Sequence, residues 1–284
     1  MKIYIINVDN KYQLPPRKIR AWPEHSIGFN VEIAFLDFLL KSNFVTKNPD
    51  EADWHYLPLM WSYWQLSNNY GRDNRSELQR YLDKIILDDY TTFTVSEADN
   101  EPGFDIGRTV VFSANQKDGW IPIPIITLPH QVPGKLPKKK YLSNFVGTVK
   151  PWHVRVEMQK LLENRTDVKI EYSKKGESKF VNTILESYST LCPRGSALSS
   201  YRFYETMQLG VVPIMIADYD MRPFPDRIDW ESCSYFINDV KQLPVILDNF
   251  YVAELEGKGN NAKEIWNDLF KNWPDYVLDI LDKK

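Results

Sequence analysis

The chain has 284 residues, of which 43% are hydrophobic and 26% are charged. This length allows about two domains, each large enough for its own core. The 35 basic and 38 acidic residues give a net charge of −3 at pH 7, which excludes the strongly basic surface typical of nucleic-acid-binding proteins. The two cysteines, Cys192 and Cys233, are too few for a disulfide framework and lack zinc-ligand spacing, so we expect buried free thiols.

The first eight residues, MKIYIINV, are typical of a core strand and not of a signal peptide. No run approaches the ~18 consecutive apolar residues of a membrane span. We therefore expect a soluble cytoplasmic protein without a membrane anchor.

The amino-terminal half alternates strand-like and helix-like segments. Apolar residues recur at helical spacing over 28–42 and 76–89, which predicts two amphipathic helices. The strand-like runs are 2–7, 53–59, 91–96 and 109–114. Strands that alternate with helices predict a parallel α/β layer.

A proline- and lysine-rich interval, IPIPIITLPHQVPGKLPKKKY, occupies 121–141. Its prolines disfavour a continuing helix or a central strand, so we interpret it as the crossover between domains. The predicted division is an amino-terminal domain of residues 1–135 and a carboxyl-terminal domain of residues 136–260. Two helical segments over 261–284 are expected to pack back across the domains.

The second half repeats the alternation. Strand-like runs are 142–147, 168–173, 190–193, 211–217 and 233–238, and helical patterns are 153–165, 179–189 and 201–209. The predicted fold class is therefore α/β, with two Rossmann-like domains.

The stretch RGSALSSYRFYETMQLG, 194–210, carries the main candidate site. Ser199 or Ser200 is a suitable N-cap for a helix that Gly210 ends. Free amides at a helix N-terminus attract anions, and an arginine such as Arg202 offers bidentate donors to a diphosphate. Glu205, one turn further on, can accept hydrogen bonds from ribose hydroxyls. The alternative is an exposed ion pair worth about 0.2–0.5 kcal/mol.

Three separated blocks occur in the order of a known family: NPDEADWHYLPLMW at 48–61, YLSNFVGTVKPWHVR at 141–155, and the long block from 186 to 230. They resemble the exostosin-like glycosyltransferases of family 47. In size the chain is similar to the stand-alone xylosyltransferases of this family in large algal viruses, the chloroviruses. The resemblance implies a glycosyltransferase-B fold with two domains facing a cleft, a UDP-sugar donor, inversion at the anomeric carbon, and no required metal or other cofactor.

The resemblance also implies roles for single residues. Arg202 and Glu205 are expected to handle the diphosphate and ribose of the donor, and Arg155 to lie near the phosphates, so both arginines are counted as catalytic. Lys174, which follows a strand, is a further candidate phosphate or sugar contact, with a solvated lysine as the alternative. The full expected donor-binding set is Arg155, Lys174, Arg194, Gly195, Ser199, Ser200, Arg202 and Glu205.

Inversion needs a general base to deprotonate the acceptor hydroxyl, and two loops of the first domain offer carboxylates. Asp73 in YGRDNRS is the first choice, because its loop follows a block that resembles the family. The alternative role for Asp73 is an N-cap of the following helix. Glu97 and Asp99 in SEADNEPG are the other candidate bases.

Aromatic residues are dense between 54 and 70, and aromatic rings stack on the C–H faces of sugars. We expect Trp54 or Tyr56 to be core. The expected acceptor-binding set is Trp61, Tyr63, Trp64, Asp99 and His130, the last of these at the domain crossover.

Asp218 and Asp220 form a D-x-D pattern that metal-dependent transferases use, but the resemblance implies that this position does not bind metal. Asp229 and Trp230 are interpreted as structural. The expected metal set is therefore empty.

The resemblance thus implies an inverting, metal-independent glycosyltransferase that moves a sugar, with xylose as the preferred candidate, from a UDP-sugar to a glycan or glycoprotein acceptor, in the host-cell cytoplasm if a virus encodes it. The alternative is a non-catalytic glycan-binding protein on the same fold. A Rossmann oxidoreductase is disfavoured, because no G-x-G-x-x-G follows a predicted strand.

Overall fold

The computed structural model describes residues 1–13, 31–98, 103–115, 119–127, 129–148, 153–171, 177–195 and 197–284. The chain divides into two compact units. The first comprises Met1–Ile123 together with Trp273–Lys284, and the second comprises Pro124–Asn272. The division therefore falls within the proline-rich interval, at 123/124, whereas the sequence analysis placed it at 135/136.

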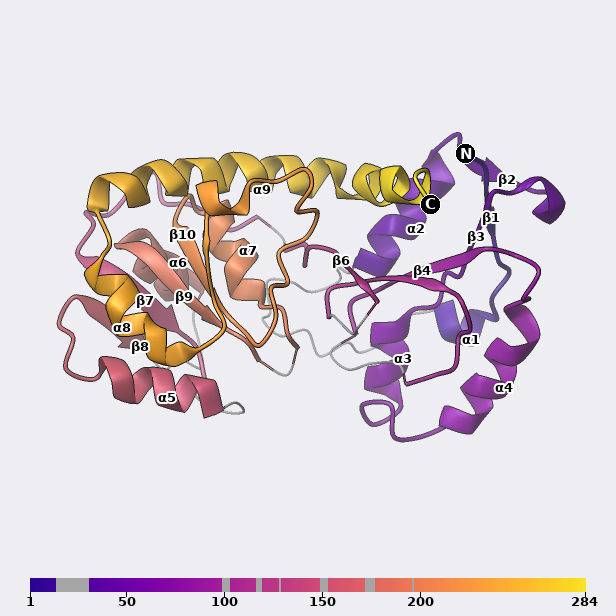
Figure 1. The fold of residues 1–284 in the computed structure, drawn as a ribbon, viewed down its shortest axis with the longest axis horizontal. Coiled ribbons are helices and arrows are strands. Elements are labelled where there is room, and N and C mark those ends of the chain that lie inside the picture. Colours follow the sequence, from indigo (N-terminus) through magenta and orange to yellow (C-terminus); the bar gives the residue numbers. More distant parts are fainter. Residues whose placement is uncertain are drawn as a thin grey trace. The chain divides into compact units, whose positions relative to one another are not determined.

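The first unit contains a parallel sheet in the order β2-β1-β3-β4-β5-β6 (Figure 1). Its strands are β1 (Ile3–Ile5), β2 (Val45–Thr46), β3 (Trp54–Tyr56), β4 (Thr92–Ser96), β5 (Val110–Ser113) and β6 (Ile121–Pro122). Its helices are α1 (Asn10–Gln13), α2 (Val31–Lys41), the 3-10 turn η2 (Pro49–Glu51), α3 (Trp61–Ser67) and α4 (Arg75–Ile85).

Helices cover both faces of this sheet. On one face, Phe35 of α2 packs on Tyr56 and Phe93 of the strands and on Trp273 near the chain end, with ring centroids 5.3, 6.0 and 5.7 Å apart. On the other face, α3 and α4 bury apolar side chains that include Trp64. Burial on both faces agrees with the apolar runs of β1 and β5, and it extends to β4, where alternating Thr, Phe and Val side chains are all buried.

The second unit has a parallel sheet in the order β11-β10-β9-β7-β8. Its strands are β7 (Tyr141–Val146), β8 (Val168–Glu171), β9 (Ser187–Pro193), β10 (Val212–Ile216) and β11 (Tyr235–Ile237). Its helices are α5 (His153–Leu162), α6 (Glu177–Leu185), α7 (Tyr201–Gln208), α8 (Leu243–Asp248) and most of α9 (Val252–Leu281), with 3-10 turns η3 (Trp230–Ser232) and η4 (Val240–Gln242).

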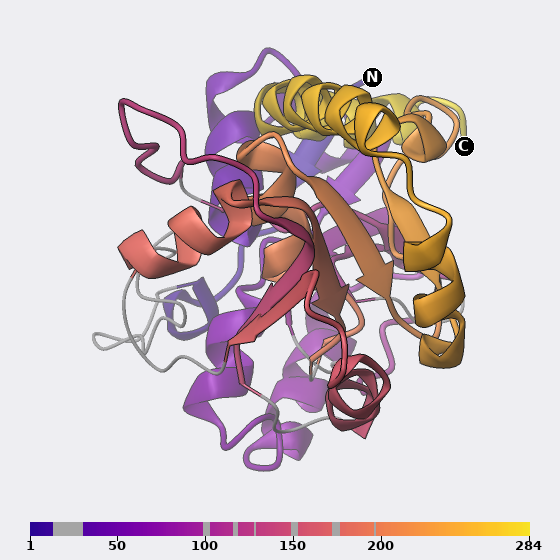
Figure 2. The same ribbon diagram turned by 90° about the vertical axis from the view of Figure 1, so that its left-hand side faces the viewer.

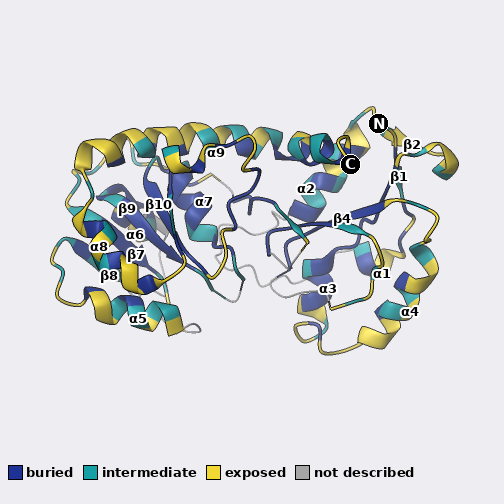
Figure 3. Cartoon of the chain, in the orientation of Figure 1, coloured by how far each residue is buried: buried dark blue, intermediate teal, exposed yellow. Residues whose placement is uncertain are grey.

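The helices of the second unit also divide between two faces. One core joins the strands to α5 and α8, and a separate cluster joins α6 to the segment that leads into β10. Figure 2, which looks onto this unit, shows α5 and the gold α8 on one side of the sheet and the salmon α6 on the other. The strands are the buried layer and the outward helix faces are exposed (Figure 3). Two separate parallel α/β units confirm the predicted Rossmann-like fold class.

Two predicted elements differ from the structure. The helix expected over 179–189 ends at Leu185, because Ser187 and Ser189 pair with β7 as part of β9. The carboxyl terminus is one helix, α9, where two segments were expected. Its Pro274 is accommodated within the helix, close to the division between the units.

Gly259 explains why the start of α9 was missed. A Cβ at this position would lie 2.5 Å from the carbonyl oxygen of Gly210, so the helix needs glycine there to pack on that turn. Sequence patterns treat such a glycine as a break.

Among the described residues, no helix has the length and apolar character needed to cross a bilayer.

Candidate functional site

The candidate site lies where β7 and β9 end side by side in the second unit. The two strands pair in parallel with Asn144 opposite Thr190, so the loops that follow them leave the sheet at the same edge. The loop after β9 leads to α7, which begins at Tyr201 and ends before Gly210. Gly210 has φ +72°, the left-handed conformation that ends a helix, so the predicted stop is confirmed.

Arg202, in the first turn of α7, places its guanidinium against two aromatic rings. The guanidinium carbon lies 4.8 Å from the ring centre of Phe145 on β7 and 5.6 Å from that of Phe180 on α6. Its Nε is buried and has no hydrogen-bond partner among the described residues. Burial lowers the pKa of Arg202, and the Glu205 carboxylate opposes that shift. A partly desolvated cation with an unsatisfied donor is therefore present at this edge.

Arg155 of α5 lies close to Arg202 and shares the Phe145 ring, 5.7 Å from its guanidinium carbon. It donates to three backbone carbonyls, with Nη1 2.9 Å from the oxygen of Thr148, Nε 3.2 Å from that of Arg194 and Nη2 3.3 Å from that of Pro193. Burial, and then the positive charge of Arg202, lower the pKa of Arg155 to about 10. The loops after β7 and β9 therefore hold this guanidinium beside a second cation.

Two glycines leave room for these arginines. A Cβ at Gly147, directly after β7, would lie 2.9 Å from Nη2 of Arg202, closer than real Cβ contacts allow. A Cβ at Gly195 would lie 3.2 Å from Nη2 of Arg155. The expected donor set named Gly195, whereas Gly147 was missed, although it ends a predicted strand.

Glu205 is buried and contacts His130, with Oε1 3.4 Å from Nε2 and side chains 3% and 0% exposed. This burial rules out the exposed ion pair considered as the alternative role of Glu205. The sequence analysis placed His130 at the domain crossover, as an acceptor contact or a structural residue. In the structure His130 belongs to the second unit and packs on α7.

The remaining described members of the predicted donor set lie on the same loop. Ser200 occupies the N-cap position of α7, but its side chain makes no capping hydrogen bond, and Ser199 is buried. Arg194 forms an ion pair with Asp218 after β10. Lys174 and Asp99, expected in the donor and acceptor sets, lie outside the described residues.

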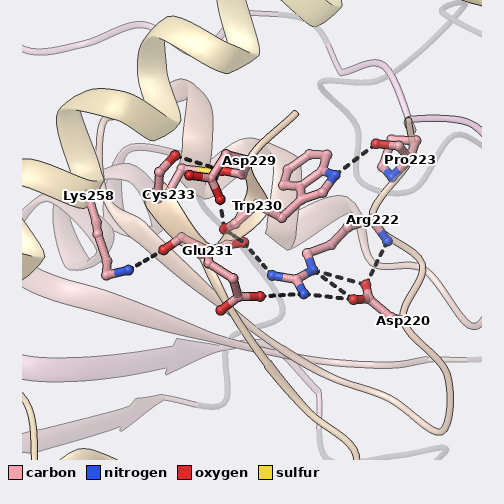
Figure 4. A network of polar contacts seen from close by, with 10 residues as sticks. Asp220, Arg222, Pro223, Asp229, Trp230, Glu231, Cys233 and Lys258 are labelled. Carbon is pink, nitrogen blue, oxygen red and sulfur yellow. Dashed lines mark hydrogen bonds and ion pairs between the residues drawn. The ribbon is translucent and has the colours of Figure 1, made fainter. Parts of the chain in front are cut away.

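Both aspartates of the D-x-D pattern are paired with arginines. Asp218 pairs with Arg194, and Asp220 accepts from Nε and Nη2 of Arg222 at 3.0 and 2.7 Å (Figure 4). Arg222 also donates to Glu231 at 2.8 Å. Among the described residues, no group of three or more His, Cys, Asp or Glu side chains is placed to hold a metal ion.

The predicted structural role of Trp230 is confirmed. Its ring is buried, and its Nε1 donates to the carbonyl oxygen of Pro223 at 2.8 Å (Figure 4). Ser234 extends this network, because its Oγ donates to the carbonyl of Trp230 and accepts from Nη1 of Arg222. The network fixes the loop between β10 and β11.

The predicted aromatic platform for a sugar is wrong, because its three rings are buried. The exposed fractions are 1% for Trp61, 5% for Tyr63 and 7% for Trp64. Trp61 donates from Nε1 to Oγ1 of Thr94 at 2.9 Å, and Trp64 packs edge-on against Phe104. Residues 61 and 64 are one helical turn apart and share the face that the core takes. Trp54 and Tyr56 are core, as expected.

Asp73 is exposed in the turn between α3 and α4. The residue that precedes α4 is Asn74, in the left-handed conformation, so the alternative N-cap role of Asp73 is wrong.

Glu32 is a fully buried acid that the sequence analysis did not single out. Its carboxyl accepts from the backbone and hydroxyl of Ser62 at 3.1 and 2.8 Å and from the backbone of Glu97 at 2.9 Å. Glu97 in turn accepts from the backbone of Val31 at 3.0 Å. Burial raises the pKa of Glu32 to about 8. A glutamate on the apolar face of the helix predicted over 28–42 was the available signal.

The second unit thus has the features of a protein that binds an anionic ligand: a parallel α/β sheet, a helix N-terminus and two arginines at the carboxyl edge. Comparison with known proteins identifies the family. The family model described as the exostosin GT47 domain matches residues 91–250, more than half of the chain. The chain therefore belongs to the exostosin glycosyltransferases of family 47.

Relatives of known description span both units. The chain is 27% identical over 307 residues to "Probable glucuronosyltransferase GUT1" of Oryza sativa subsp. japonica, covering 87% of this chain and 70% of the relative. It is 27% identical over 301 residues to "Probable beta-1,4-xylosyltransferase IRX10" of Arabidopsis thaliana, covering 87% and 71%. Among solved structures, TarM is similar with a TM-score of 0.38 at 10% identity, covering 73% of this chain and 57% of that chain.

Proposed function

We propose that the chain is an inverting glycosyltransferase that moves one sugar from a UDP-sugar to a hydroxyl of a glycan or glycoprotein. The observation that carries the proposal is the pair of neighbouring guanidiniums, Arg155 and Arg202, at the carboxyl edge of the second sheet. Family membership supports the reaction class. Two adjacent cations suit a diphosphate, which carries two neighbouring anionic groups.

The arginines would act on the leaving group. As the bond between sugar and phosphate breaks, negative charge grows on the diphosphate, and fixed donors in a partly desolvated site stabilise that charge. The Nε of Arg202 has no partner in the part of the chain that the structure describes, so a phosphate oxygen would satisfy it without breaking a hydrogen bond seen there. Binding would also relieve the repulsion that lowers the pKa of Arg155.

We propose that this role needs no metal ion. A divalent cation and paired arginines are two solutions to the same charge problem. The arginine pair is present, and Asp218 and Asp220, the residues that resemble a metal-binding pattern, are each ion-paired with an arginine.

Xylose is the proposed donor sugar, on the resemblance to viral xylosyltransferases and on the printed description of one plant relative. Glucuronic acid is the second candidate, because another relative is described as a probable glucuronosyltransferase. For the base, we propose Asp73, whose carboxylate is exposed to an incoming acceptor, with Glu97 at 8% exposure as the alternative.

Calorimetry of UDP binding in EDTA, for wild type and Arg202→Ala, tests the donor site. We expect wild type to bind and the variant to lose at least tenfold in affinity, since a hydrogen bond to a charged group is worth about 1.5–3 kcal/mol. Arg165→Ala is the matched control. Arg165 precedes β8 at the opposite end of the strands and pairs with Asp167 and Asp248, so its loss should leave UDP affinity unchanged.

Transfer is then assayed with UDP-xylose and UDP-glucuronic acid, without acceptor for slow hydrolysis and with xylan fragments for transfer. Asp73→Asn and Glu97→Gln identify the base, because the correct variant loses turnover and keeps UDP affinity. Absence of UDP binding, or affinity indifferent to Arg202, would remove the donor site. The glycan-binding alternative would then be favoured.

A further inference from the structure

His130 contacts the candidate donor site, although it lies outside the segment that carries Arg202 and Glu205. Its Nε2 lies 3.4 Å from Oε1 of Glu205, and both side chains are buried. Its backbone nitrogen donates to Oε1 of Gln208 at 2.8 Å, one turn further along α7. Two contacts to α7 therefore fix the position of this histidine.

An aromatic ring connects His130 to the arginine. The imidazole lies 5.5 Å from the ring centre of Phe180, and the guanidinium carbon of Arg202 lies 5.6 Å from the same ring centre. Glu205 acts electrostatically on Arg202 from the same helix. The three polar side chains, His130, Glu205 and Arg202, form one charge cluster in which His130 and Glu205 are buried and Arg202 is half-buried, with Phe180 as its apolar wall.

Because Glu205 is buried, the free energy of its carboxylate depends strongly on the charges around it. A buried carboxylate is costly unless positive groups or hydrogen-bond donors compensate it. Arg202 supplies compensation to Glu205 in the free protein. If Arg202 turns its charge toward a diphosphate, part of that compensation is withdrawn, and His130 is the group in contact with Glu205 that can replace it.

We propose that His130 is a positioning residue of the donor site, which holds the Glu205 carboxylate in place and takes up a proton when the donor diphosphate engages Arg202. The inference rests on the proposed function, because it assigns a role within the same site. His130 does not touch the reacting atoms in this account. It acts through Glu205 on the cation that binds the leaving group.

The direction of the pH effect follows from the charges that face His130. Among the described residues they include the Glu205 carboxylate in contact, and Arg202 across the Phe180 ring, both on α7. A bound diphosphate adds negative charge beside Arg202, which favours the imidazolium. The complex would then hold its proton to higher pH than the free protein. Donor affinity must consequently fall as pH rises.

The experiment is calorimetric titration with UDP-xylose between pH 6.0 and 8.5, for wild type and His130→Gln. The phosphates of a nucleotide sugar stay ionised throughout, so they add no pH dependence of their own. A one-unit rise in the histidine pKa on binding would make wild-type Kd up to about tenfold weaker above the titration of His130 than below it. The glutamine variant should bind with one Kd across the range.

Repeating the titration at pH 7 in buffers of different ionisation enthalpy counts the protons directly. Wild type should take up a fraction of a proton on binding, and His130→Gln none. His55→Gln is the matched control, since His55 is also buried but lies in the first unit beside Tyr90. This control should keep the wild-type proton uptake and pH profile.

A second variant covers the case in which His130→Gln does not fold. Glu205→Gln removes the carboxylate that would hold the proton on His130, so it should also abolish the pH dependence. Coincident pH profiles of wild type and His130→Gln, with affinity still dependent on Arg202, would overturn the positioning role and leave the donor site intact. Absence of nucleotide-sugar binding in wild type would overturn both proposals.

Discussion

Gly147→Ala tests the geometry of the arginine pair by adding one methyl group. The new Cβ would lie 2.9 Å from Nη2 of Arg202 and 3.1 Å from Cζ of Phe145. The φ of Gly147 is outside the left-handed region, so alanine fits the backbone and the conflict is with side chains. The guanidinium is the flexible partner, and it must therefore move away from the loop after β7.

The expected loss of UDP affinity follows from the hydrogen bonds that the Arg202 guanidinium is proposed to donate. Displacing it by several tenths of an ångström weakens hydrogen bonds to the diphosphate that are worth about 1.5–3 kcal/mol each when one partner is charged. Loss of one such bond weakens binding by roughly 10- to 100-fold. Folding should change little, because replacing glycine by alanine stabilises a protein by about 0.4–1 kcal/mol through the unfolded chain, which offsets the local crowding.

The assay is calorimetry of UDP binding, with thermal unfolding as the check on stability. Gly134→Ala is the control, because a Cβ there meets no atom within 4 Å, and it should bind UDP like wild type. If Gly147→Ala binds UDP within about twofold of wild type and keeps its melting temperature, the guanidinium of Arg202 does not hold the diphosphate in the position inferred from the structure.

Two further predictions concern stability. Glu32 has a folded pKa of about 8, raised from 4.5 by burial, so the folded state holds its proton more tightly and stability falls as pH rises between these values. Glu32→Gln should flatten that dependence in urea unfolding at pH 5 and pH 8; an unchanged slope would mean that Glu32 is ionised in the folded state. Arg222→Met should lower the free energy of unfolding by about 1–3 kcal/mol, because Asp220 and Ser234 lose a partner, and it should leave UDP affinity unchanged. Glu231→Gln is its control in urea unfolding, since Glu231 is 71% exposed and should cost less than about 1 kcal/mol. Equal losses in the two variants would contradict a network centred on the arginine.

The segment 194–210 shows which features can be predicted from neighbouring residues in the sequence. Gly210 was predicted to end α7 because a left-handed residue is a local requirement, and the structure has that conformation. Arg202 and Glu205 were assigned to one site by the family resemblance, and their spacing of three, which puts them on one helix face, is compatible with that assignment. The partners of Glu205 were not predictable in this way, since His130 is distant in the sequence and separated from α7 by β7, β8 and β9.

The aromatic segment shows the opposite result. Trp61, Tyr63 and Trp64 suggested a sugar platform by composition, but composition does not say which way a ring points. Their helix packs on the sheet of the first unit, and the indole of Trp61 donates into that core. The rings therefore contribute to folding in the position where a binding surface was expected.

The sequence by itself determined the α/β class, the order of most elements and the arginine–glutamate motif, because periodicity, caps and stops depend on residues within a few positions of one another. The tertiary structure decided which ionisable groups lie together: Arg155 beside Arg202, His130 against Glu205, and Glu32 with Glu97. Such pairings depend on the order of strands in the sheet and on desolvation, which act between segments far apart in the chain.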